Sequence, residues 1–414
     1  MGVVSMYVLS KNYNSRRFFS VNKLSPSLVA LQNWQHQQQQ LEDCSNHPSL
    51  LSSSVPSAVS SWWDQVTLLG STSCDDVRLF EQEGLWKDPN GGQYFIRKII
   101  KAPHHFVSLH NNNYDHVRHS SIFIGGNYYE HHIHDRFERI LAEAERTTIA
   151  TARSLPIVID VGANLGYYSL LSAARQHAVI SFEINPSNLI RLCESIQWNS
   201  NLGMAKNKDP TTFFGPIRLF RNGVSNQHNQ SLQVVVPGNP GEASIQDVSQ
   251  NDSNRRQQLE SFANGTSAND PTFATTVTLD SFAIDHGWLP TTTTQNNKAS
   301  NRVVDIAILK IDTEGHEPFI LQGATKLLSS HLIRNILIEY RMICRDTVFE
   351  IILESGYVLV DDNRGDVKKG TTMLTKEASK SFIDELHNTL ELRRNTSKPM
   401  FEDLWFRVES HKLP

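Results

Sequence analysis

Residues 157–185 constrain the fold of this chain most, because they read as a strand, a helix and a second strand joined by short turns. The apolar run 157–159 is typical of a strand buried on both faces. After Gly166, apolar residues recur at the spacing of one helical face, namely Tyr167, Leu170, Leu171 and Ala174. Residues 179–182 then predict the second strand. Such a unit has a right-handed crossover and brings the carboxyl ends of both strands to one sheet edge, where ligands bind.

The turn after the first strand has the composition of a ligand-binding loop. Asp160 ends the strand, and Gly162 and Gly166 bracket a turn in which a missing Cβ tolerates positive φ and allows close approach of a ligand. Asn164 lies between the glycines. Glu183 ends the second strand, where doubly wound folds place an acid for ribose hydroxyls. These residues predict a nucleoside site.

The same turn argues against cofactors that carry phosphates. A nicotinamide fingerprint needs glycine at 162, 164 and 167, but the chain has Asn164 and Tyr167. No Gly-Lys-Ser/Thr follows, which excludes a P-loop. S-adenosylmethionine, a nucleoside cofactor without phosphates, fits better. A Rossmann-like sheet whose turn binds nothing is the alternative.

A second cluster of acids follows a later apolar strand within residues 303–324. Pro318 suits the first position of a helix, which would make Glu317 the N-cap and residues 312–316 a loop. The buried stripe of that helix would be Ile320, Gly323, Ala324 and Leu327. Another buried strand, residues 335–340, carries Glu339 near its end. Acidic side chains are therefore expected to gather on one sheet edge.

Five motifs occur in order: D-V-G-A-N-L-G, F-E-I-N-P, T-L-D-S-F, L-K-I-D-T-E-G-H-E with L-Q-G-A, and I-L-I-E-Y. This set resembles the FkbM family of S-adenosylmethionine-dependent methyltransferases over about residues 120–408. The resemblance implies the α/β, Rossmann-like class I methyltransferase fold. That fold has a seven-stranded, mostly parallel sheet with an antiparallel last strand and helices on both faces. Residues 356–361 and 403–408 would form its closing pair.

The resemblance also assigns the cofactor site. Class I enzymes commonly place an acid after the third strand for adenine, whereas this chain has Asn222, followed by Ser225, and an amide can also recognise adenine. The implied cofactor is S-adenosyl-L-methionine. Its predicted binding residues are Asp160, Gly162, Asn164, Gly166, Glu183 and Asn222.

Catalysis by this family mainly aligns the acceptor with an activated methyl group, and a hydroxyl acceptor also needs a base. His316 is the first candidate, because imidazole titrates near neutral pH, and Asp312 is the second. Glu314 completes the catalytic set. The alternatives are a solvated loop histidine for His316 and helix capping for the two acids. Asp312→Ala is expected to abolish turnover while leaving the fold intact.

The run E-H-H-I-H-D at residues 130–135 raises the question of a metal. In a strand, His132 and His134 would share one face. A third ligand at diagnostic spacing is missing and no H-E-x-x-H occurs, so no metal is predicted. The histidines are instead expected to line the acceptor pocket or cover the cofactor, with an exposed polar surface as the alternative.

Composition divides the chain into three parts. Residues 1–75 are rich in Gln and Ser and predict disorder, and residues 76–140 predict a cap or lid that sets acceptor specificity. Residues 141–414 would form the methyltransferase domain, with polar surface loops at 203–216, 247–272 and 291–301.

Partners and function class follow from charge and from the strand-end motif. A net charge of −4 without a basic stripe argues against nucleic acid. The strand-end motif is Asp312-Thr313-Glu314-Gly315 and not the Asn/Asp-Pro-Pro-Tyr/Phe of enzymes that methylate base amines, so a hydroxyl of a small molecule or glycan is the expected acceptor. Two alternatives are an inert nucleoside-binding module of the same fold and an NAD(P)-dependent oxidoreductase. The acids at the predicted edge favour an active enzyme.

The four cysteines are widely spaced and imply no disulfide framework. Cys193 shares a helical stripe with Leu189, Leu192 and Ile196 and is predicted to be a core thiol. No run is long enough for a transmembrane span, and the basic, acid-free amino terminus resembles a transit peptide. A soluble enzyme is expected, with cytoplasmic localisation favoured and organellar targeting as the alternative. The sequence leaves the oligomeric state open.

Overall fold

The structure of the chain is a computed structural model. It describes residue 74 and residues 94–99, 103–110, 130–151, 155–206, 214–235, 244–246, 273–290, 304–361, 372–393 and 401–408. Apart from Cys74, the segment 1–75 that the sequence predicts to be disordered lies outside these residues, and so does the insertion at 247–272.

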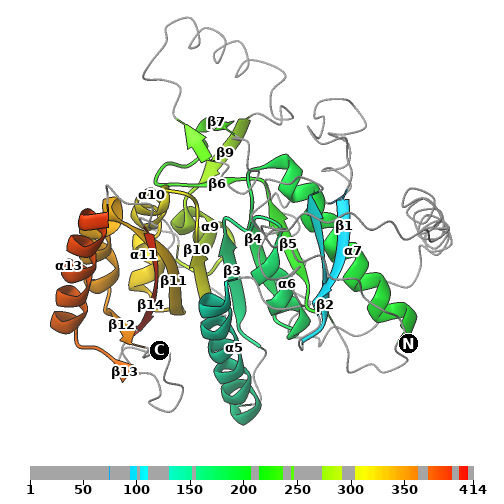
Figure 1. Cartoon of the computed structure of the whole chain (residues 1–414), viewed down its shortest axis with the longest axis horizontal. Coiled ribbons are helices and arrows are strands. Elements are labelled where there is room, and N and C mark those ends of the chain that lie inside the picture. Colours follow the sequence, from blue (N-terminus) through cyan, green and yellow to red (C-terminus); the bar gives the residue numbers. More distant parts are fainter. Residues whose placement is uncertain are drawn as a thin grey trace, which may run out of the picture. The chain divides into compact units, whose positions relative to one another are not determined.

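A mixed sheet of eight strands forms the centre of the described part (Figure 1). Its order is β13-β12-β14-β11-β10-β3-β4-β5. The strands are β3 (Ile157–Val161), β4 (Val179–Phe182), β5 (Ile217–Phe220), β10 (Ile306–Ile311), β11 (Ile333–Arg341), β12 (Tyr357–Asp361), β13 (Thr372–Met373) and β14 (Phe401–Val408).

Strands β5, β4, β3, β10 and β11 pair in parallel, whereas β14 is antiparallel to β11 and to β12. The predicted α/β class and the closing pair of β12 and β14 are therefore confirmed. The predicted number of strands is wrong by one, because the two-residue strand β13 adds to the outer edge of β12. Residues 362–373, which include β13, contain no apolar run that would predict a strand.

Helices cover both faces of this sheet. Val158 packs in one hydrophobic core with α5 (His131–Thr151), α6 (Tyr167–Ala174) and α7 (Pro186–Lys206). Its neighbour Ile159 points to the opposite core, as the two-residue period of a strand requires. That second core contains α9 (Leu279–Asp285), α10 (Glu317–Gln322), α11 (Thr325–Ser329), the π-helical segment η5 (Val348–Leu353) and α13 (Lys376–Arg393). The 3₁₀ turn η4 (Met342–Cys344) and α12 (Arg345–Thr347) lead into η5.

A second, four-stranded sheet has the order β6-β9-β7-β8. Its strands are β6 (Gly223–Val224), β7 (Ser231–Val235), β8 (Ser244–Gln246) and β9 (Phe273–Val277). Thr278 follows β9 and caps α9, since its side chain accepts a hydrogen bond from Ser281 N. The predicted T-L-D-S-F motif therefore joins a strand to a helix.

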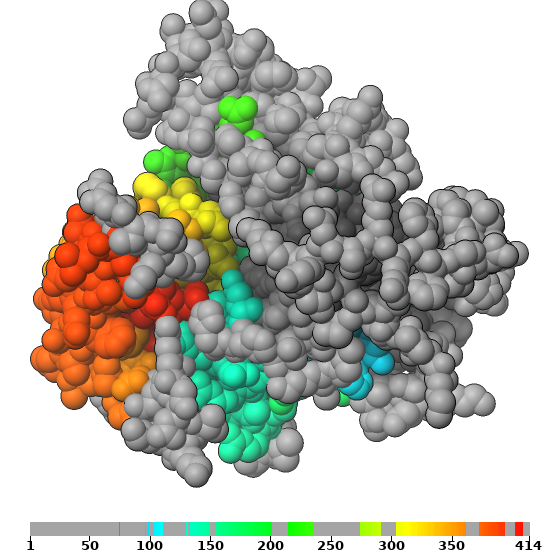
Figure 2. All heavy atoms as spheres, in the orientation of Figure 1, coloured from blue at the N-terminus to red at the C-terminus, as the bar shows by residue number. Residues whose placement is uncertain are grey.

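Helix α5 occupies the segment in which His132 and His134 were expected to share a strand face, and that expectation is wrong. The carbonyl oxygen of Glu130 accepts hydrogen bonds from the backbone N–H groups of Ile133 and His134, both at 3.0 Å, and so starts the helix. Figure 2 shows α5 in teal beside the red of β14. Arg136 joins the two elements, because its Nη1 donates to the backbone oxygen of Asp403 at 2.7 Å.

Strands β1 (Tyr94–Ile99) and β2 (His105–His110) form a separate antiparallel pair. Strand β2 binds to α7 through polar contacts. Ser108 N donates to Ser195 Oγ and Phe106 N donates to Asn199 Oδ1, each at 2.8 Å. These strands belong to the segment 76–140, whose role as a lid stays a prediction.

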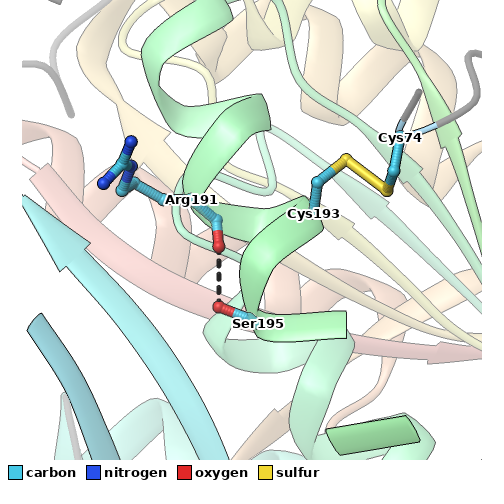
Figure 3. The surroundings of a disulfide bond; sticks show 4 residues. All are labelled: Cys74, Arg191, Cys193 and Ser195. Atoms are coloured by element: carbon cyan, nitrogen blue, oxygen red, sulfur yellow. Dashed lines mark hydrogen bonds between the residues drawn. A yellow bond between two sulfur atoms is a disulfide. The ribbon is translucent and has the colours of Figure 1, made fainter. Parts of the chain in front are cut away.

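A disulfide joins Cys74 to Cys193 on α7 (Figure 3). Cys193 is buried as predicted, but the expectation of a free core thiol is wrong. The two Cα atoms lie 5.4 Å apart, which suits a disulfide, although 119 positions separate the cysteines in the sequence. Only the fold reveals this proximity. Cys344 is buried and free.

Among the helices of the described residues, none combines the length and the apolar character needed to cross a membrane.

Candidate active site

The carboxyl ends of β3 and β4 form a compact loop region. Gly162 N and Ala163 N both donate to Phe182 O at 3.0 Å, which ties the loop after β3 to the last residue of β4. Asn164 has a φ of 52°, and its N–H donates to Glu183 Oε2 at 2.6 Å. The two halves of the predicted cofactor motif are thus brought together.

Glu183 is the residue that fixes this loop. Its second oxygen, Oε1, accepts from Asn185 N at 2.7 Å. Burial raises the pKa of Glu183 to about 7, against the lowering effect of these backbone hydrogen bonds. Each carboxylate oxygen has a second lone pair, so the side chain can still accept a ribose hydroxyl.

The two glycines of the loop serve packing within the protein. A Cβ atom on Gly162 would lie 1.8 Å from the backbone oxygen of Asp312, and one on Gly166 would lie 2.1 Å from Leu192 Cδ1. Both glycines also have positive φ, 77° and 82°. The predicted tolerance of positive φ is therefore confirmed, and the space that a Cβ would need is taken by Asp312, after β10, and by Leu192 on α7.

Asn222, the predicted adenine residue, follows β5 at the same sheet edge. Its Nδ2 donates to the backbone oxygen of Thr275 on β9 at 2.9 Å. The ends of β4 and β5 are close to each other, because Glu183 N donates to Phe220 O at 3.1 Å. Asn222 therefore lies on the edge with the other cofactor candidates and is held by the second sheet.

Lys310 lies at the centre of the edge, and the sequence analysis missed it. It occupies a buried position in β10, opposite Asp160 in β3. Its Nζ lies 3.1 Å from Asp312 Oδ2, 3.7 Å from Asp160 Oδ1 and 5.3 Å from the ring centroid of Tyr168. Burial alone would lower the pKa of Lys310, but the charges of Asp312, Asp160 and Glu130 outweigh it and raise that pKa. A lysine inside an otherwise apolar strand was the available signal.

Glu130 approaches this cluster from the start of α5. The hydroxyl group of Tyr168 donates to Glu130 Oε2 at 3.2 Å. Burial raises the pKa of Glu130 to about 7, and the charges of Asp312 and Asp403 add to the rise. The sequence analysis included Glu130 in the run E-H-H-I-H-D and gave it no catalytic role.

Arg341, at the end of β11, holds two further acids. Its Nε lies 2.7 Å from Glu339 Oε2 and its Nη2 lies 2.5 Å from Glu314 Oε2. Burial, followed by the charge of Asp312, raises the pKa of Glu339, although Arg341 opposes the rise. The predicted catalytic residue Glu314 is therefore held by an ion pair, and it has a positive φ of 58°.

His316 points away from the acids. Its Nε2 forms a 3.0 Å hydrogen bond with Ser225 Oγ, and its ring stacks on Phe319. Burial lowers the pKa of His316 to about 4, so the imidazole is neutral and a weak base at neutral pH. The proximity to Ser225 places His316 beside the chain that follows β6.

Glu317 supports the loop from within. The predicted N-cap is wrong by one residue, because α10 starts at Glu317 and His316 occupies the cap position. Glu317 is fully buried, and its Oε1 accepts from Thr313 N at 2.9 Å and from Gly315 N at 3.1 Å. This carboxylate closes the 312–317 loop on itself and is not directed at a ligand. The predicted buried stripe is divided between α10 and α11, and a Cβ on Gly323 would lie 2.1 Å from Ser225 O.

Within the described ranges, no group of three or more His, Cys, Asp and Glu side chains has an arrangement that could hold a metal ion. The side chains of His131 and His132 lie outside those described. His134 is buried, and its Nδ1 forms a 3.0 Å hydrogen bond with the hydroxyl group of Tyr167.

Comparison with known protein families gives a match to the family described as "Methyltransferase FkbM domain" over residues 160–359. No curated protein and no solved structure matches the chain. The matched range begins at Asp160 and includes the predicted cofactor loop, Lys310, the 312–317 loop and Glu339. Residues 160–359, which are 200 of the 414 residues, therefore carry a methyltransferase domain of the FkbM type.

Proposed function

We propose that this protein transfers a methyl group from S-adenosyl-L-methionine to a hydroxyl oxygen of a small molecule or glycan. One observation carries the proposal: a domain of a methyltransferase family places its buried acids along a single sheet edge. Parallel strands bring their carboxyl ends to that edge, which is where ligands bind in open α/β sheets. The edge carries the buried residues Asp160, Glu183 and Glu339 and the partly exposed Asp312.

The sheet supports the finer assignment to class I methyltransferases. Without the short strand β13, its order is β12-β14-β11-β10-β3-β4-β5, with β14 as the antiparallel strand. This order supports the proposal of a seven-stranded, Rossmann-like arrangement with one added edge strand.

The residues present fit a nucleoside cofactor. Asp160 is fully buried, and its Oδ1 has no hydrogen-bond partner among the described residues. A buried oxygen without a hydrogen-bond partner at the end of a strand suits a ligand that supplies a hydrogen-bond donor. Glu183 would hold the ribose hydroxyls and Asn222 the adenine. When bound, the cofactor would supply an activated methyl group.

The pocket for the acceptor would form on the Asp312 side of the edge. Gly315 has a φ of 105° and open space where its Cβ would be, so the 312–317 loop leaves room there. Specificity would come from residues 76–140, of which the described part includes β1, β2 and the start of α5. The carboxylates at this edge suit a polar, uncharged hydroxyl acceptor and disfavour nucleic acid, because phosphate groups would be repelled.

Calorimetric titration with S-adenosylhomocysteine tests the cofactor site. We expect the wild-type protein to bind it and Glu183→Ala to bind it at least tenfold more weakly, while NADH does not bind. Glu145→Ala is the matched control, since Glu145 pairs with Arg175 away from the edge. Failure of wild type to bind, or tighter binding of NADH, would refute the proposal.

Turnover is tested with S-adenosylmethionine labelled in its methyl group and a panel of hydroxylated acceptors: methyl glycosides, polyols and phenols. We expect label in an ether product, and none with Asp312→Ala despite normal binding of S-adenosylhomocysteine. Label found on nitrogen or carbon would leave a methyltransferase but contradict transfer to oxygen.

A further inference from the structure

We propose that Glu130, at the first turn of α5, takes the proton from the acceptor hydroxyl, and that Tyr168 positions its carboxylate. This inference rests on the proposed methyl transfer to oxygen. It assigns the base to a residue upstream of the matched domain, in place of His316 or Asp312.

Four elements meet around the Glu130 carboxylate. The hydroxyl group of Tyr168, from α6, donates to its Oε2 at 3.2 Å. Lys310 and Asp312 act on it electrostatically from the end of β10, and Asp403 does so from β14. Glu130 therefore lies beside the acid that the family motif places at the active edge, on the face of the sheet that α5 covers.

The position of Glu130 is fixed by its backbone. Its φ of 45° is strained for a residue with a side chain, and its carbonyl oxygen receives two hydrogen bonds from the first turn of α5. Arg136 anchors that turn to β14 through Asp403 O. Strain of this kind is retained where the surrounding structure demands a particular direction of the side chain.

The other candidates are less suitable as bases. Asp312 is engaged with Lys310 at 3.1 Å, and Glu339 and Glu314 share Arg341. The imidazole of His316 faces Ser225. Glu130 has one neutral donor, and a carboxyl whose pKa is about 7 combines ionisation at neutral pH with useful basicity.

The O–H bond of the acceptor breaks and its proton passes to Glu130, while the acceptor oxygen forms a bond to the methyl carbon. The bond between that carbon and sulfur breaks, and its electron pair stays on sulfur. The positive charge of Lys310 compensates the negative charges of Asp160 and Asp312. The negative charge of Glu130 is therefore tolerated beside them.

The first experiment needs no acceptor. Carbon NMR of protein labelled at the glutamate carboxyl carbons, with Glu130→Gln used for assignment, is expected to show Glu130 titrating near pH 7. The hydrogen bond from Tyr168 lowers this pKa. Tyr168→Phe is therefore expected to shift the titration to higher pH. Titration of Glu130 below pH 5 in the wild type would overturn the proposal.

The second experiment measures labelled methyl transfer to the panel of methyl glycosides, polyols and phenols as a function of pH. The wild-type rate should rise with pH through about 7 as Glu130 loses its proton. Glu130→Gln should reduce kcat at least a hundredfold, as loss of a general base does, and should remove this rise. Tyr168→Phe should retain most activity at high pH and move the rise upward.

Binding of S-adenosylhomocysteine separates the two proposals. Unchanged affinity in Glu130→Gln with lost transfer supports a role as proton acceptor, whereas weakened affinity would make Glu130 a cofactor residue and overturn this inference alone. A wild type that does not bind S-adenosylhomocysteine refutes the proposed function, and Glu130 then loses its role as well. Wild-type transfer rates in Glu130→Gln would also overturn it.

Discussion

The backbone oxygen of Asp312 lies 1.8 Å from the place that a Cβ atom on Gly162 would occupy. The first residue after β10 is therefore in close contact with the loop after β3, and Asp312 N also donates to Val161 O at 3.1 Å. The proposed cofactor loop and the proposed catalytic loop are in direct contact and cannot shift independently. A substitution that disturbs this contact is therefore expected to affect both the stability of the fold and the activity.

Gly162→Ala tests that contact. The positive φ and the blocked Cβ position together should lower the free energy of unfolding by about 2–4 kcal/mol, measured by urea denaturation. Gly287 provides a matched control, since its φ of 69° is similar but no atom lies within 4 Å of its Cβ position. Gly287→Ala should lower the free energy of unfolding by only about 1–2 kcal/mol, because only the strain of the positive φ remains. Equal losses in both variants would contradict the proposed contact.

Lys310→Met tests the compensation of buried charge. The substitution leaves Asp160 and Asp312 without their cation, so the free energy of unfolding should fall by roughly 3–5 kcal/mol, as for other broken buried pairs. Lys326→Met, on the exposed side of α11, should change it by less than about 0.5 kcal/mol. Chemical denaturation at neutral pH measures both. An unaltered Lys310→Met protein would show that Lys310 is not required to compensate these acids.

The raised pKa of Glu183 predicts a pH dependence of stability. Its folded-state pKa of about 7 exceeds the ordinary value, so between about pH 4.5 and 7 the folded protein holds a proton that the unfolded chain has lost. The free energy of unfolding therefore falls as pH rises through this window. The pKa of His316 is lowered to about 4, so between about pH 4 and 6.5 the unfolded chain holds a proton that the folded protein has lost. His316 therefore makes the free energy of unfolding rise with pH in that range.

The difference between wild type and Glu183→Gln isolates the effect of Glu183. The variant should lose a slope of up to about 1.4 kcal/mol per pH unit within the window. In Glu145, burial is outweighed by hydrogen bonds with His177 and Arg175, which lower its pKa to about 2, so Glu145→Gln should leave the slope between pH 5 and 7 unchanged. Parallel stability curves for wild type and Glu183→Gln would rule out the raised pKa.

The disulfide between Cys74 and Cys193 should stabilise the fold. In the chain-entropy picture, a bond that closes a loop of this size contributes roughly 4–5 kcal/mol. Cys74→Ala and a thiol reductant are each expected to lower the free energy of unfolding by a similar amount, and the reductant should have no further effect on Cys74→Ala. Titration of free thiols in the protein unfolded without reductant provides the check. Accessible thiols at both positions before reduction would show that the bond does not form.

The sequence determined the βαβ unit and the order of the motifs, because periodicity, glycines and strand-end acids are local features. Residues 157–159 and 179–182 are strands, and α6 starts at Tyr167 as predicted. The closing pair of β12 and β14 also agrees with the resemblance. These features depend on a few neighbouring residues or on an ordered set of motifs, which a single chain displays directly.

Only the tertiary structure decided which distant side chains meet. The start of α5, the first turn of α6 and the end of β10 bring together Glu130, Tyr168 and Lys310, although 180 positions separate the first residue from the last. Cys74 reaches Cys193 in the same way. Electrostatic environment also depends on such packing, because burial moves the pKa of His316 down and that of Glu130 up. Sequence spacing carries no information on burial by remote elements, so the sequence favours His316 as the base, whereas the packing favours Glu130, the proposed base.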